Sequence, residues 1–260
     1  MGNICDCLNE KKYSDNPSPR TPLLAGSSHA PTLTRQPSPI GQSARLNKVE
    51  KQDFESSLDA IHQIKLSKVS TVSSLDKTFQ DHGKLYNDLY TNFIELRKSL
   101  NTFKSFFEAE TSGIPIISDC LTLLAKRCGQ AKLSGNRTKN CVLISYDRRE
   151  VSQQCQGPPE DVIEIIELYN KINKLIKNIL EKSPQVRSSI TLVLEEEQKL
   201  KREVTKADPD GKLGPEPLKL TSENFQKLHK LPEYINTIEK YTSKTCKEIL
   251  NGSKPLFEDV

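Results

Sequence analysis

The first residues of the chain carry three groups that can accept a fatty acyl chain. Gly2 presents a free and unhindered amine once Met1 is removed, and this amine is the acceptor in N-myristoyl transfer. The thiols of Cys5 and Cys7 lie close to it in the sequence and can form thioesters with palmitate. One myristoyl chain holds a protein on a bilayer only weakly, whereas a second acyl chain makes the attachment stable. This arrangement predicts a lipid anchor at Gly2, Cys5 and Cys7.

The opening segment, residues 1–7, resembles that of dually acylated proteins of the cytoplasmic membrane face. The resemblance covers these seven residues only. It implies a peripheral protein that is held on the cytoplasmic side of a membrane by myristate and palmitate. Asp6 stands where the usual myristoylation pattern has Ser or Thr. The alternative is a Met-Gly start without acylation and with two exposed thiols.

Residues 1–46 have the composition of a disordered tether that is rich in Pro and Ser. Ser18, Thr21 and Ser38 each precede a proline and are candidate phosphorylation sites. Phosphate there would add about −1.5 to −2 charge beside an anionic membrane surface. Simple turns in the tether are the alternative at each site. The pair Leu23 and Leu24 resembles a dileucine sorting signal, although the usual upstream acid is missing.

Beyond the N-terminus, no group of residues has the spacing of an active site. The seven cysteines match no zinc-ligand pattern, the four histidines are scattered, and no phosphate-binding loop or nucleophile elbow occurs. A Cys–His pair built from distant residues such as Cys128 or Cys155 stays open. Basic residues alternate with acids and do not gather with aromatics, so we expect no nucleic-acid partner. We also expect no enzymatic activity, no metal and no cofactor.

The composition favours long helices over a thick core. The 260 residues are 35% hydrophobic and 28% charged, with no Trp and a net charge of +4. A polar chain of this kind suits helices that bury one narrow apolar stripe. No apolar run approaches the roughly 18 residues that cross a bilayer, and no signal peptide follows the start. We therefore expect an anchored protein that does not span the membrane.

Apolar residues recur at steps of three and four in two long stretches, residues 75–107 and 162–204. In the second stretch the pattern continues past Pro184, which predicts one kinked helix of about 45 residues or two helices stacked end to end. Shorter stripes predict a helix before them, at residues 54–66, and one after them, at 225–249. The predicted fold is all-α over residues 47–252, an elongated helical bundle or coiled coil of three to four long helices.

Two segments escape this pattern. Residues 113–159 are predicted to be irregular, with a short helix near Leu121 and with Asn140–Tyr146 fitting either a strand or a buried helical turn. Residues 253–260 are predicted to be a flexible tail. Its terminal Val260 could add to a PDZ-type groove, or Leu256 and Phe257 could pack back on the last helix.

A lipid anchor, a tether and helices with continuous apolar seams together indicate an interaction scaffold. We expect a non-enzymatic adaptor for trafficking or signalling complexes on the cytosolic face of an endomembrane, endolysosomal or Golgi. This architecture is similar to that of the acylated subunits of lysosomal scaffold complexes. The expected partners are the membrane, through the lipids, and proteins or further copies, through the seams. There are two alternatives: a helical bundle that itself binds or remodels the bilayer, and a soluble regulator of an enzyme. A clustered face of Lys or Arg residues would favour the bilayer-binding bundle, and the heptad positions show no such face.

Overall fold

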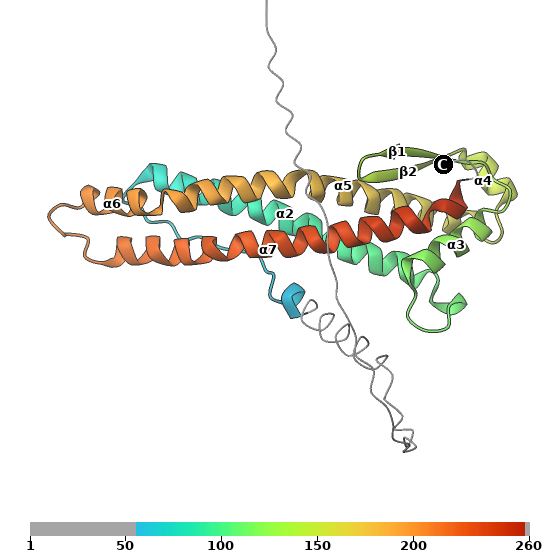
Figure 1. Ribbon diagram of the computed structural model, residues 1–260, viewed down its shortest axis with the longest axis horizontal. Helices are drawn as coiled ribbons and strands as arrows, with labels where there is room; N and C mark the ends of the chain where they lie inside the picture. Colours follow the sequence, from blue (N-terminus) through green and yellow to red (C-terminus); the bar gives the residue numbers. More distant parts are fainter. Residues whose placement is uncertain (1–55, 258–260) are drawn as a thin grey trace, which may run out of the picture. The chain divides into compact units, whose positions relative to one another are not determined.

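The structure is a computed structural model that describes residues 56–257 (Figure 1). The chain divides into two units, residues 1–46 and residues 47–260, and every described residue belongs to the second unit. Helices make up most of this part, so the prediction of a mainly helical protein is confirmed. A two-stranded sheet is added to the helices.

The elements differ greatly in length, and three helices are much longer than the rest. In chain order they are α2 (Ser73–Ser105), the 3-10 helix η1 (Glu108–Glu110), α3 (Ile117–Cys128), β1 (Leu133–Thr138), β2 (Cys141–Tyr146), α4 (Arg148–Gln154), α5 (Pro159–Glu195), α6 (Glu197–Ala207), α7 (Glu216–Gly252) and the 3-10 helix η2 (Lys254–Leu256). In the segment 113–159, predicted to be irregular, the short helix expected near Leu121 is α3 and the strand alternative for Asn140–Tyr146 holds as β2, whereas β1 and α4 were not predicted.

The three long helices α2, α5 and α7 contact one another along their lengths (Figure 1). All the apolar residues of the seam at 75–107 are buried, and Tyr86, Phe93 and Leu96 have no exposed surface. Ile176 and Ile190 of α5 and Ile235 and Ile238 of α7 are equally inaccessible. The apolar stripes therefore face each other within the chain, which is how amphipathic helices gain most of their stability.

Helix α5 continues through Pro184, where a kink or a new helix start was predicted. Pro184 lies inside it, and the helix ends only at Glu195, after which α6 begins at Glu197. Pro184 is exposed, so its ring can stand on the solvent side, while the hydroxyl of Ser183 donates to the carbonyl of Ile179 at 2.7 Å. The prediction of two helices end to end is right, but the junction lies at Glu196 and not at the proline.

The helix predicted at 54–66 is present at residues 56–59, but residues 60–72 form no helix, which corrects the rest of that prediction. The amide of Asn87 on α2 accepts from Ile64 N at 3.0 Å and donates to Ile64 O at 2.9 Å. Asn224 on α7 holds Ser67 in the same way, at 2.8 and 2.7 Å. Because these side-chain amides satisfy the main chain, the segment needs no helical hydrogen bonds of its own.

The end of the chain is also held against the body. Leu256 and Phe257 are buried, with 5% and 7% of their surface exposed, and the hydroxyl of Ser253 lies 2.8 Å from that of Tyr169. The flexible tail predicted from residue 253 is therefore wrong for residues 253–257, where the packing alternative holds. Val260 and the PDZ-type alternative lie outside the described residues.

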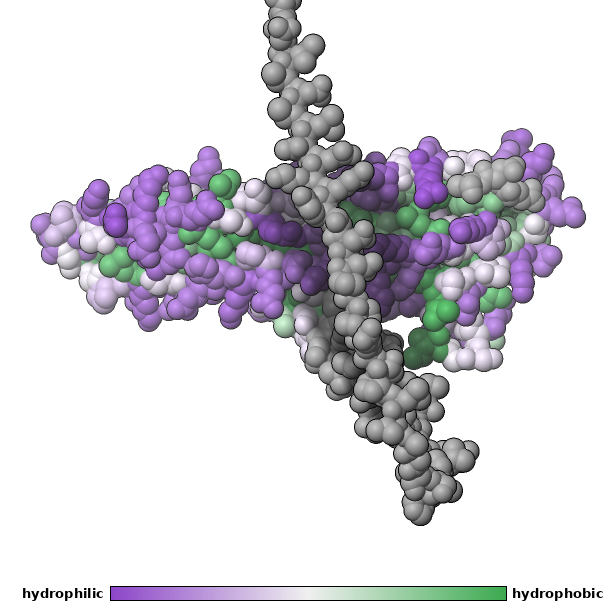
Figure 2. Space-filling view, viewed as in Figure 1, coloured by the Kyte–Doolittle hydropathy of each residue, from purple (hydrophilic) through white to green (hydrophobic). Residues whose placement is uncertain are grey.

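The outer surface of the helices is polar. On the face shown in Figure 2, hydrophilic residues cover most of the area over α6 and α7. Among residues 56–257, no helix is long and apolar enough to cross a membrane.

Candidate interaction site

The sites predicted from the sequence all lie in the part of the chain that the structure does not describe. They are Gly2, Cys5, Cys7, Ser18, Thr21, Leu23, Leu24 and Ser38. The structure consequently places none of them, and the search for a site within the helical body starts from other residues.

Most cysteines of the body are buried. Cys120, Cys128, Cys141 and Cys246 are buried, and Cys155 is partly buried. Burial raises the pKa of the Cys120 and Cys128 thiols from 9.0 to about 11, because a thiolate loses its hydration inside the protein. At neutral pH these thiols are protonated, and the thiolate is the form that attacks electrophiles or binds metals. Within residues 56–257 no three His, Cys, Asp or Glu side chains gather in a way that could hold a metal ion.

Native Cys128 should react with iodoacetamide at pH 8 about 100-fold more slowly than in the urea-unfolded chain, because its pKa is higher by about two. Mass spectrometry of the alkylated peptides over time measures both rates. Since the unfolded thiol loses its proton first, the free energy of unfolding should also fall as the pH rises from 9 towards 11. Equal rates in the two states would show that Cys128 is accessible and ionised.

One pair of side chains resembles a catalytic dyad. Nδ1 of His82 lies 2.7 Å from the carbonyl of Thr78, so it donates its proton there, and Nε2 accepts from the hydroxyl of Ser189 at 3.0 Å. Ser189 lies inside α5, where the surrounding N–H groups are used by the helix and cannot stabilise an oxyanion. We assign this pair a structural role, as a polar contact between α2 and α5.

The hairpin β1–β2 leaves one edge without partners. Ile144 of β2 gives both its N–H and its C=O to the amide of Asn170 on α5, at 2.7 and 2.8 Å, and Val142 N donates to Asn173 at 3.3 Å. Ile144 is paired with Gly135 in the antiparallel register. Because Ile144 points its main-chain groups to α5, those of Gly135 must point away from β2.

The same alternation turns the main-chain groups of Leu133 and Arg137 outward. Within residues 56–257, no group outside the hairpin bonds to the N–H or C=O of Leu133, Gly135 or Arg137. Figure 1 shows β1 on the outer side of the hairpin, with β2 next to α5. An exposed edge of this kind is a template for an added strand.

A groove of about 470 Å³ lies beside this edge. Its walls come from the end of α3, from β1 and from the C-terminal residues, and include Ala125, Ala131, Leu133, Gly135, Leu256 and Phe257. A Cβ at Gly135 would lie only 3.1 Å from the Phe257 ring, so glycine lets the ring approach the strand closely. The groove is in the size range of pockets that receive a ligand or a large side chain.

The charged side chains of the hairpin itself are all basic. Residues 129–146 contain Lys132, Arg137 and Lys139, all exposed, and no Asp or Glu. The nearest acid on the β1 side is Glu150 of α4, whose carboxylate accepts from Lys132 N at 2.9 Å. The unpaired edge, the groove and the basic residues together fit an extended segment of neutral or acidic character. We call this combination the β1 edge site.

Sequence reasoning did not find the β1 edge site. Leu133–Thr138 lacks a clear alternation of apolar and polar residues, and Thr138 is its one β-branched residue. The available signal was the apolar run at Asn140–Tyr146, which could have prompted a search for a pairing partner across the two-residue loop Lys139–Asn140.

Comparison with protein-family models, with curated proteins and with solved structures finds no match to this chain. The function therefore has to be inferred from the residues and the fold alone.

Proposed function

We propose that this protein is a non-enzymatic, lipid-tethered adaptor whose body is an elongated helical bundle. In this proposal the body holds an extended segment of a partner protein at the β1 edge site. The observation that carries it is the row of unpaired main-chain groups at Leu133, Gly135 and Arg137, next to a groove whose lining contains no acidic residue.

The mutual burial of the three long helices supports this choice of surface. The apolar seams of α2, α5 and α7 are buried against one another. We therefore propose a partner surface other than the seams, through which partners were expected to bind. The large apolar residues that stay exposed are spread over three helices and two loops: Leu85, Ile94, Ile114, Ile116, Leu192, Leu213 and Leu218. A strand edge recognises a partner mainly through its main chain and does not require a large apolar face.

The membrane part of the proposal comes from the sequence. Acylation of Gly2, Cys5 and Cys7 would hold the tether on the cytosolic face of an endomembrane, and we propose an endolysosomal or Golgi membrane. The β1 edge site would then present a partner at that surface, and the protein would act in the assembly of trafficking or signalling complexes.

Selection of peptides from a random display library on the full-length protein tests the β1 edge site. We expect the enriched peptides to be extended, poor in Pro and neutral or acidic. Arg137→Pro should weaken their binding about tenfold or more, because it removes one outward N–H and one charge; a tenfold change corresponds to about 1.4 kcal/mol. Arg137→Gln is the matched control, since it removes the charge and keeps the N–H.

The titration of one selected peptide against the three proteins measures these effects. The loss should be distinctly larger for Arg137→Pro than for Arg137→Gln. Circular dichroism and thermal melting of the Pro variant check that the body stays folded. If the selected peptides bind the wild type and both variants equally, the β1 edge site is not where they bind.

A further inference from the structure

Helices α5 and α7 form a groove of about 370 Å³ on another part of the body. Its lining consists of Arg187 from α5 and of Asn236, Glu239, Lys240, Ser243, Lys244 and Lys247 from α7. Four of these seven residues are cations and one is an acid. The heptad positions predicted no clustered basic face, and Lys240, Lys244 and Lys247 of α7 correct this prediction.

The α7 side of this groove follows from helical spacing. Counted from Asn236, the residues Lys240, Ser243, Lys244 and Lys247 follow at four, seven, eight and eleven positions, which places them along one face of the helix. The three lysines are exposed and Ser243 is partly buried. Ammonium groups and neutral hydrogen-bond donors therefore line the same side of the groove.

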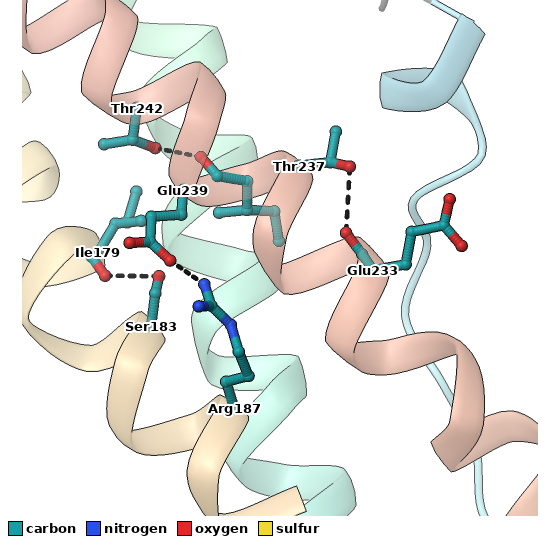
Figure 3. A network of polar contacts seen from close by, with 8 residues as sticks. Ile179, Ser183, Arg187, Glu233, Thr237, Glu239 and Thr242 are labelled. Atoms are coloured by element: carbon teal, nitrogen blue, oxygen red, sulfur yellow. Dashed lines mark hydrogen bonds and ion pairs between the residues drawn. The ribbon is translucent and has the colours of Figure 1, made fainter. Parts of the chain in front are cut away.

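The single acid in the lining is already neutralised. Figure 3 shows Arg187 reaching from α5 to the carboxylate of Glu239 on α7, where the two side chains form an ion pair. Lys240, Lys244 and Lys247 form no ion pair with any residue in 56–257. The groove consequently keeps about three uncompensated positive charges, which favour an anionic ligand.

Arg187 provides a second observation. Its Nε atom is buried, and none of the residues 56–257 accepts a hydrogen bond from it. A buried donor without a partner is costly and is uncommon in folded proteins. Nε itself has almost no exposed surface, but the Arg187 side chain as a whole is 37% exposed and lines the groove. Its guanidinium group is suited to planar groups and to phosphate oxygens.

We propose that this groove binds a phosphomonoester group. Such a group carries about −1.5 to −2 charge and three acceptor oxygens at neutral pH, which matches several ammonium groups and neutral donors better than a single carboxylate does. The headgroup of a phosphorylated lipid and a soluble phosphate ester share this chemistry. Bound to a lipid headgroup, the groove would fix the orientation of the body on a membrane. This role is separate from the β1 edge site and does not depend on it.

Flotation of the full-length protein with vesicles tests the proposal. Protein made in bacteria carries no acyl chains, so any binding must come from the chain itself. We expect association with phosphatidylcholine vesicles that contain phosphatidylinositol phosphate, and much less with vesicles that contain phosphatidylinositol, which lacks the monoester. Replacing Lys240, Lys244 and Lys247 together with Gln should reduce the association about tenfold or more, because each lysine near an anionic surface contributes several-fold.

The matched control replaces Lys77, Lys84 and Lys98 of α2 with Gln. These lysines are also exposed, and the change in net charge is the same. We expect this variant to bind as the wild type does, and thermal melting should show that both triple variants are folded. Equal losses in the two variants, or equal binding to both vesicle types, would overturn the proposal.

Calorimetric titration with soluble inositol phosphate separates the two sources of the phosphate. Tight binding of the soluble compound, lost in the α7 variant and kept in the α2 variant, would assign the groove to a soluble ester. Weak binding of that compound, together with strong and monoester-dependent vesicle binding, would assign it to a lipid headgroup. Failure of both ligands to distinguish the two variants would contradict a phosphate site.

Discussion

Replacing Phe93 with Ala should lower the free energy of unfolding by about 3–5 kcal/mol. Phe93 lies in the middle of α2 and has no exposed surface. Its ring meets that of Tyr241 on α7 edge to face, with the ring centres 5.5 Å apart. The substitution removes this aromatic contact and leaves a cavity where α2 packs against its neighbours.

Urea unfolding followed by circular dichroism measures this loss. Ile94→Ala is the matched control, because Ile94 is the next residue on the same helix and is 40% exposed. We expect the control to change the unfolding free energy by no more than about 1 kcal/mol. Similar losses at Phe93 and Ile94 would mean that the seam of α2 does not face the interior of the body.

Gly2→Ala should move the protein from the membrane fraction to the soluble fraction of cells. Alanine at this position removes the acceptor for myristate, and without myristate the attachment lacks its first lipid. Replacement of Cys5 and Cys7 with Ser should leave a weaker, exchanging attachment, because one myristoyl chain binds a bilayer only marginally. Fractionation and immunoblotting of the three proteins measure the distribution.

The cysteine variant serves as the intermediate case in this comparison. We expect membrane association to decrease in the order wild type, Cys variant and Gly2→Ala. A Gly2→Ala protein that sediments with membranes as completely as the wild type would show that the attachment does not use Gly2.

The long helices could be predicted, because the pattern that indicates them repeats between residues close together in the sequence. Burial of one helix face repeats every three to four residues, so the seams from Leu75 to Phe107 and from Val162 to Val204 can be read directly from the sequence. Pro184 misled the prediction of the helix junction, because an exposed proline ring can be accommodated without ending a helix.

The non-helical conformation of residues 60–72 could not be predicted, because contacts with residues far along the chain hold this segment. Ser67 is held by Asn224, which lies 157 positions further along the chain. The apolar residues of this segment, Ile61, Ile64 and Val69, are buried as a helix stripe would be. Periodicity identifies the burial of such residues, but it does not reveal which side chains satisfy the main chain between them.

The β1 edge site depends on non-local contacts in the same way. Which main-chain groups of β1 stay unpaired follows from the contacts of Ile144 with Asn170, and these are set by the packing of the hairpin on α5. In the basic groove, the row of lysines on α7 is local, but the neutralisation of Glu239 requires Arg187 of α5 to reach it. The sequence predicted that the protein has an interaction surface. The positions that we propose for the β1 edge site and the basic groove depend on how the helices and the hairpin pack.

Recruitment of a soluble reporter tests most directly whether this protein is an adaptor. A fluorescent protein carrying a peptide selected on the β1 edge site is expressed in cells together with the wild type, Gly2→Ala or Arg137→Pro. We expect the wild type to bring the reporter to membranes, Gly2→Ala to bind it in the soluble fraction, and Arg137→Pro to stay on membranes while the reporter remains soluble. A reporter that stays soluble beside the membrane-bound wild type, or that follows Arg137→Pro to membranes as fully as it follows the wild type, would contradict the proposed function.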